Sequence, residues 1–308
     1  MSEVSEVARY EIRPLSLSET LDTGFQLLKK HVGVLFPLSV VGQIPTVIFT
    51  SAFAWMLDPF AFEKAGFPEL GASFLVAIAF YALAMLLLLP VVIGAITSAV
   101  GAAYLGTKLS LADCLRQGAG RMFPLIISYL IFSVIILVGF LALFVLVGLL
   151  FGLGAATLPE SGFGTVLGGI LILAMALVAI PAFLALAGLL SLLPCVLAAV
   201  VMLEGRSMFD AVARTFSLVT AELGRMTGLG MVLYLFVMVV PTGMQFVVGS
   251  IPIFGAVVLG LANALAQAYL FTTAVVAYFD VRCRLESFDL EHLAQLVEGN
   301  ASSVEAGR

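Results

Sequence analysis

Hydrophobic residues follow two different patterns along this chain of 308 residues. In the first pattern, a short segment carries apolar residues at spacings of four, four and three, which places them on one face of a helix. The pattern occurs three times, as Leu17, Leu21, Phe25 and Leu28, then Leu111, Leu115, Ala119 and Met122, then Met208, Val212, Phe216 and Val219. We therefore predict three amphipathic helices, at residues 15–31, 111–121 and 208–223.

Each amphipathic segment begins with a serine that is followed, three positions later, by an acidic residue. The pairs are Ser16 with Glu19, Ser110 with Asp113, and Ser207 with Asp210. This spacing is typical of a capping box, or its aspartate variant, at the start of a helix. The serines lie 94 (110 − 16) and 97 (207 − 110) residues apart, so the chain is predicted to contain three similar units.

In the second pattern, the amphipathic segments are followed by uncharged runs longer than the ~20 residues that cross a bilayer. We predict six spans, at residues 32–57, 71–105, 122–157, 165–203, 226–248 and 253–279, with a loop at 58–70. The predicted fold class is an all-α integral membrane protein in which one amphipathic helix and two spans form a pseudo-threefold repeat. The units are 15–109, 110–206 and 207–286, between tails at 1–14 and 287–308, the second with a short helix at 290–298.

Composition supports this class. Hydrophobic residues make up 62% of the chain, whereas a soluble domain has roughly 45–50% apolar residues. Charged residues make up 11%, against about 25% in a soluble domain. The net charge of −5 is spread over loops and tails, which does not indicate a nucleic-acid partner. The three cysteines show no metal-ligand spacing.

Positive charge predicts the orientation. Thirteen of the fourteen Lys and Arg residues fall in the tails or in the loops after the second and fourth spans, and only Lys64 lies on the other side. By the positive-inside rule, both ends of the chain and the three amphipathic helices are cytoplasmic. If span 165–203 were broken at Pro194 into two crossings, the basic residues after it would lie on the opposite side of the membrane. We therefore predict one long helix, tilted or kinked.

We find no ionisable residue inside a predicted span, and the buried polar candidates are Gln43, Gln245, Asn263 and Gln267. Asn263 and Gln267 are four positions apart and share a helix face. One interpretation is a polar patch that lines a substrate groove. The other is hydrogen bonding between helices, worth about 0.6–2 kcal/mol per contact.

Basic residues lie near the membrane ends of the amphipathic helices, at Lys29, Lys30, Arg121 and Arg225. They are typical of a helix in the cytoplasmic headgroup layer and are candidate headgroup contacts. The alternative is that these helices only anchor the span that follows them.

Two end segments carry a resemblance to a known family. The first runs from Arg13-Pro14-Leu15-Ser16 through Leu27-Leu28-Lys29-Lys30 to Phe36-Pro37-Leu38, and the second, residues 277–291, reads AYFDVRCRLESFDLE. They resemble a bacterial six-span family, the membrane domain of glycerophosphoryl diester phosphodiesterase and its stand-alone relatives. In fused members a soluble barrel domain does the hydrolysis, and this chain has no room for one. The resemblance therefore implies a membrane module of a bacterial cytoplasmic membrane without phosphodiesterase activity.

The sequence contains no catalytic motif that we recognise, and we expect no catalytic residue, cofactor or metal. The expected function is a non-enzymatic accessory or scaffold subunit that organises a membrane complex or lipid. Expected partners are membrane lipids and either a second copy or another membrane or cytoplasmic protein. The alternative function is a carrier or exporter of a lipid-like or apolar substrate.

Overall fold

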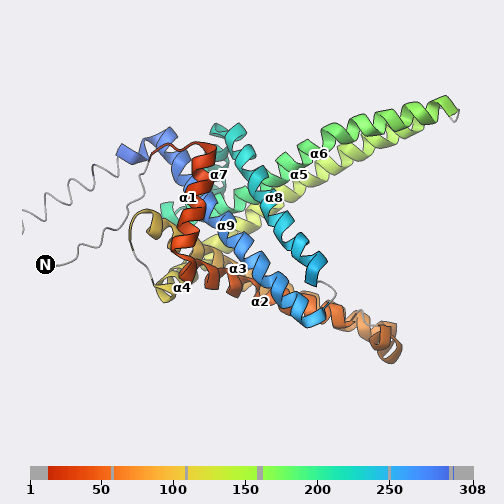
Figure 1. The fold of residues 1–308 in the computed structure, drawn as a ribbon, viewed down its shortest axis with the longest axis horizontal. Coiled ribbons are helices and arrows are strands. Elements are labelled where there is room, and N and C mark those ends of the chain that lie inside the picture. Colours follow the sequence, from red (N-terminus) through yellow and green to blue (C-terminus); the bar gives the residue numbers. More distant parts are fainter. Residues whose placement is uncertain are drawn as a thin grey trace, which may run out of the picture.

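The structure is a computed structural model that describes residues 13–56, 59–107, 110–157, 162–248, 251–290 and 294. The described ranges fold into helices alone (Figure 1). In chain order these are α1 (Leu17–Lys30), α2 (Val32–Met56), α3 (Pro59–Tyr104), α4 (Leu111–Gly120), α5 (Met122–Thr157), α6 (Gly162–Ala199), the π-helix η1 (Val200–Glu204), α7 (Met208–Ala221), α8 (Leu223–Val248) and α9 (Pro252–Glu286).

Six of the described helices are long and apolar enough to cross a membrane, namely α2, α3, α5, α6 with η1, α8 and α9. This confirms the predicted number of spans and identifies a multi-pass integral membrane protein. The three shorter helices, α1, α4 and α7, coincide with the predicted amphipathic segments to within two residues at each end.

Three boundaries differ from or refine the prediction. The predicted loop at 58–70 is wrong, because helix α3 already begins at Pro59; proline is well suited to the first position of a helix, where its missing N–H is not needed. The long fourth span is one continuous helix through Pro181 and Pro194, and its π-helical end closes at Gly205, which has φ +75°. Helix α9 extends past residue 279 to Glu286.

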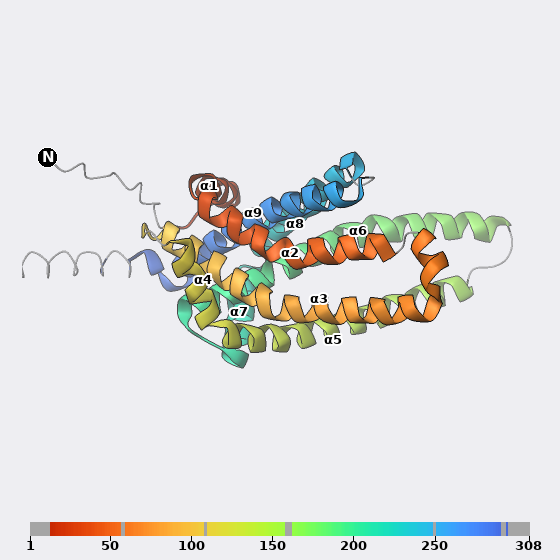
Figure 2. The same ribbon diagram turned by 90° about the horizontal axis from the view of Figure 1, so that it is seen from below.

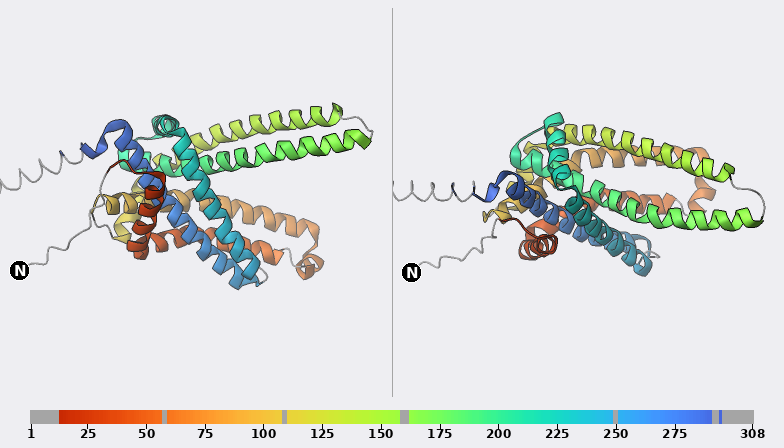
Figure 3. Two further views of the ribbon diagram at one scale, coloured as in Figure 1. Left: turned by 45° about the horizontal axis from the view of Figure 1, so that its top comes forward. Right: turned by 90° about the horizontal axis from the view of Figure 1, so that it is seen from above.

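The spans diverge from one end of the molecule (Figures 1 and 3). Helices α1, α4 and α7 gather at that end, together with the last turns of α3, α6 and α9 (Figure 2), and we call it the packed end. The buried core lies there, with its longest continuous runs at residues 92–101 and 270–281. Away from the packed end, α5 and α6 project outward and many large apolar side chains are exposed, as expected for lipid-facing surface.

Two of the three predicted caps are present. Ser16 accepts a hydrogen bond from the backbone N of Glu19 while its own backbone N donates to the Glu19 carboxylate, which completes a capping box. These hydrogen bonds and neighbouring Arg13 lower the pKa of Glu19 from 4.5 to about 2. Ser110 likewise accepts from the backbone N of Asp113.

The third predicted cap is wrong. Ser207 occupies the N-cap position of α7 but makes no side-chain cap hydrogen bond. Instead the backbone N of Met208, which has φ +56°, donates to Ser128 Oγ of α5 at 2.9 Å. A contact from a distant helix has replaced the local one.

Beside larger apolar residues on α1 and α7, each short helix buries two small residues at equivalent positions. They are Thr20 and Gly24 on α1, Cys114 and Gly118 on α4, and Ala211 and Thr215 on α7. The predicted apolar stripe is buried in part: Leu28 and Val219 are buried, whereas Phe25 is 57% exposed. Small side chains are needed because α1 and α4 approach the spans closely; a Cβ at Gly118 would lie 2.3 Å from the carbonyl oxygen of Val91.

Candidate functional site

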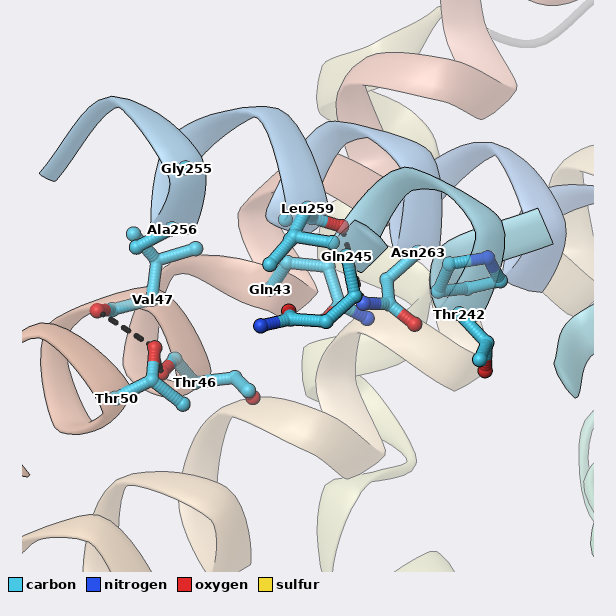
Figure 4. Close-up of a pocket in the computed structure, with 12 residues that line it drawn as sticks. Gln43, Thr46, Val47, Thr50, Thr242, Gln245, Gly255, Ala256, Leu259 and Asn263 are labelled. Atoms are coloured by element: carbon cyan, nitrogen blue, oxygen red, sulfur yellow. Dashed lines mark hydrogen bonds between the residues drawn. The ribbon is translucent and has the colours of Figure 1, made fainter. Parts of the chain in front are cut away.

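A pocket of about 500 Å³ lies between α2, α8 and α9, away from the packed end. Helix α2 contributes Gln43 and Thr46, α8 contributes Thr242 and Gln245, and α9 contributes Asn263. Figure 4 shows the amide side chains of Gln43, Gln245 and Asn263 close together although each belongs to a different helix. The structure thus brings together three of the four polar residues that the sequence identified.

The fourth residue, Gln267, is not among the residues that line the pocket. It is half-buried on α9, one turn closer to the packed end than Asn263. Asn263 and Gln267 lie on the same helix, four positions apart, but the pocket ends before the turn that carries Gln267. Sequence inspection also missed the threonines, because a threonine hydroxyl in a span often bonds to its own helix, as Thr50 does to the carbonyl oxygens of Thr46 and Val47.

The pocket walls offer hydrogen bonds without charge. None of the twelve described residues that line it has an ionisable side chain. Asn263 lines the pocket, and its Nδ2 donates to the carbonyl oxygen of Leu259 at 3.0 Å, so that this bond does not use its Oδ1. Such a lining can hold a neutral polar group by hydrogen bonding.

A charged cluster at the packed end is the second notable arrangement. The Asp280 side chain is 1% exposed and accepts the backbone N–H of Leu15 at 2.6 Å. Arg225 of α8 approaches its Oδ2 at 2.9 Å, and Arg284 approaches its Oδ1 at 3.3 Å. Both arginines also donate to the carbonyl oxygen of Leu15. Asp280 therefore connects α8, α9 and the segment that precedes α1.

Glu204 is at the centre of a neighbouring group. Its carboxylate accepts a hydrogen bond from the Tyr278 hydroxyl at 2.9 Å and pairs with Arg206 at 3.0 Å and Arg214 at 3.2 Å. Arg214 and Arg282 both bind Glu286, and the Arg282 guanidinium lies 4.4 Å from the centre of the Phe288 ring. These contacts join η1, α7 and α9.

The four predicted headgroup contacts have different surroundings. Lys29 and Lys30 are exposed at the end of α1, and Lys30 lines a pocket of about 380 Å³ together with His31 and Thr107. Arg121 is exposed and its Nη1 lies 3.5 Å from the carbonyl oxygen of Val201. Arg225, in contrast, is only 19% exposed and is paired with Asp280.

Sequence analysis missed both acidic centres of these clusters. Asp280 and Glu204 each lie one residue past the predicted end of a span, so they were placed outside the spans, whereas α9 continues beyond Asp280 and η1 ends at Glu204 itself. The available signal was the i,i+4 pairing of Asp280 with Arg284 and of Arg282 with Glu286, which is typical of a helix that continues.

The two arrangements differ in what they can do. The acids and bases around Asp280 and Glu204 are engaged with one another and with backbone groups, which indicates a structural role. The pocket has hydrogen-bonding groups that can accept a ligand. Among the described residues, no group of three or more His, Cys, Asp or Glu side chains could hold a metal ion.

Comparisons of the chain with protein-family models, with curated proteins and with solved structures found no match.

Proposed function

We propose that the protein is a non-enzymatic membrane module, an accessory or scaffold subunit that organises a membrane complex or lipid. It lies in the cytoplasmic membrane with both ends and the packed end in the cytosol. The observation that carries the proposal is the projecting pair α5 and α6 (Figures 1 and 3). These helices leave the buried core and expose large apolar side chains, among them Leu177 at 76%.

The sequence of this pair favours contact with another membrane helix. Gly148 with Gly152 on α5, and Gly164 with Gly168 on α6, form small-xxx-small pairs. Such pairs let two helices approach closely in a bilayer, where association depends on packing and not on burial from water. A second copy of this chain or another membrane protein would supply the opposing helix.

Two features support the pseudo-threefold repeat within this module. The short helices bury small residues at equivalent positions, counted from Ser16, Ser110 and Ser207. All three helices also lie at the packed end (Figure 2). In this proposal each repeat anchors two spans through one short helix, and the ion pairs hold the repeats together.

Association is tested by extraction in a mild detergent followed by native mass spectrometry. We expect an oligomer or a complex with another membrane protein. Replacing both Gly148 and Gly164 with isoleucine should reduce the associated fraction about tenfold, since overpacking costs about 1–3 kcal/mol. The matched control is Gly243→Ile on α8, where a Cβ would meet no atom within 4 Å. A monomeric wild-type protein without partner would contradict the proposal.

A second candidate function is a carrier of a lipid-like substrate, which the polar pocket at Gln43, Gln245 and Asn263 favours. A carrier, unlike a scaffold, should move a fluorescent lipid between the leaflets of proteoliposomes faster than in protein-free vesicles. If the lipid moves between the leaflets no faster than in protein-free vesicles, the carrier function is rejected and the scaffold function is retained.

A further inference from the structure

The pocket between α2, α8 and α9 contains hydrogen-bonding groups that the protein does not use itself. Within the described part of the chain, the side-chain amides of Gln43 and Gln245 make no hydrogen bond to another residue. In a bilayer, where water is scarce, a polar group without a partner is costly. A ligand that supplies hydrogen bonds would remove this cost.

Two residues that line the pocket are exposed on a helix that is long and apolar enough to cross a membrane. Gln245 and Thr242 are exposed although they belong to α8, which lies within the candidate span Leu223–Val248. A surface exposed at this position faces lipid, so an occupant can enter sideways from the bilayer. Its volume of about 500 Å³ lies within the ~300–1,000 Å³ typical of small-molecule sites, enough for a headgroup while long chains remain outside.

Charge distinguishes among the lipids that could enter. A phosphate group is bound in proteins by arginine, lysine or helix N-terminal N–H groups. The described lining of this pocket contains amides, hydroxyls and apolar groups such as Val47 and Leu259, with no cation. Burying a phosphodiester there would leave its charge unpaired, whereas hydroxyl and ester groups match the amides.

We propose that this pocket binds an uncharged lipid whose small headgroup carries hydroxyl and ester groups, of the diacylglycerol type. Gln43 and Asn263 contact the headgroup from α2 and α9, Gln245 contacts it from α8, and the acyl chains remain in the bilayer. The proposal deepens the lipid-organising part of the proposed function, but it does not require that the protein associates with a partner or moves the lipid across the membrane.

The test is photo-crosslinking of the purified protein, reconstituted in nanodiscs, with a diazirine-bearing diacylglycerol. We expect labelled peptides from α2, α8 and α9, and competition by unlabelled diacylglycerol but not by phosphatidylglycerol. The double variant Gln43→Leu/Asn263→Leu should lose about tenfold of this labelling, because two hydrogen-bonding groups are removed. Gln267→Leu is the matched control on α9, outside the pocket, and should label like the wild type.

Three results would overturn the proposal: equal labelling of the double variant and the wild type, equal competition by phosphatidylglycerol, or labelling spread evenly over all spans. Gln245→Leu provides a second route if the double variant does not fold, because Gln245 is exposed and its replacement leaves the helix contacts intact. Association in mild detergent is measured on the same samples. A protein that associates but does not bind diacylglycerol retains the proposed scaffold function and loses only this ligand.

Discussion

Replacing Asp280 with alanine is expected to destabilise the packed end by about 3–5 kcal/mol, the usual cost of removing one partner from a buried ion pair. The Asp280 carboxylate is 1% exposed and faces the guanidinium groups of Arg225 and Arg284. Without it, two partly buried positive charges remain close together, and the backbone N–H of Leu15 loses its acceptor. We therefore expect the segment that precedes α1 to detach from α9.

The measurement is thermal unfolding in detergent, combined with limited proteolysis of the N-terminal segment. Arg206→Gln is the control, because the Arg206 side chain is 50% exposed and exposed ion pairs contribute at most about 1 kcal/mol. Replacing Asp280, Arg225 and Arg284 together with leucine should recover part of the stability, because no charge is left unpaired. The recovery is partial, since the backbone N–H and carbonyl oxygen of Leu15 lose their partners. An Asp280→Ala protein as stable as the wild type would show that the cluster does not hold the short helices in place.

The elements of this fold could be predicted because their signals are local. Uncharged runs such as residues 122–139 are too long and too apolar for anything but a span, and all six reappear as helices. The caps at Ser16 and Ser110 depend only on residues three positions apart. The cap at Ser207 failed where a residue far away in the sequence, Ser128, supplied the contact instead.

The contacts between elements could not be predicted, because they join residues that are distant in sequence. Leu15 and Asp280 are 265 positions apart, and nothing near Arg225 shows that its counter-ion is on α9. The pocket has the same origin. Sequence placed Asn263 and Gln267 on one face of α9, but only the packing of α2 and α8 decides that Asn263 lines the pocket and Gln267 does not.

The amphipathic stripe predicted the buried faces of the short helices only in part, for a similar reason. A hydrophobicity pattern weights large apolar residues, and Leu17, Leu21 and Phe25 dominate it on α1. On α1, Phe25 is exposed and Leu17 and Leu21 are only partly buried. The closest approach to α9 is at Gly24, where a Cβ would lie 2.3 Å from Oγ1 of Thr273. In a soluble protein, the apolar face of an amphipathic helix marks the side that packs on the core. In a membrane protein, part of that apolar face can contact lipid instead.

Substituting Gly230 of α8 with alanine is expected to cost about 1–3 kcal/mol, the range typical of overpacking. A Cβ at this position would lie 2.4 Å from the carbonyl oxygen of Gly188 on α6, and a Cβ at Gly188 would lie 2.4 Å from the backbone N of Met231. Both obstacles are backbone atoms of a helix, which cannot turn aside as a side chain can. The two helices would have to separate along the contact that connects α6 to α8, and Gly188→Ala should have a similar effect.

The same helix supplies the control. At Gly224 and Gly243 a Cβ would meet nothing within 4 Å, so alanine there should be neutral or stabilising by up to about 1 kcal/mol through its higher helix propensity. The free energy of unfolding of the four single variants, measured in detergent, should therefore fall into two groups. It should be lower than that of the wild type for Gly188→Ala and Gly230→Ala, and equal or higher for the other two. If the stability of all four variants changes in the same direction, the change comes from replacing glycine in any helix. Only a difference between the two pairs assigns the stability to the crossing of α6 and α8.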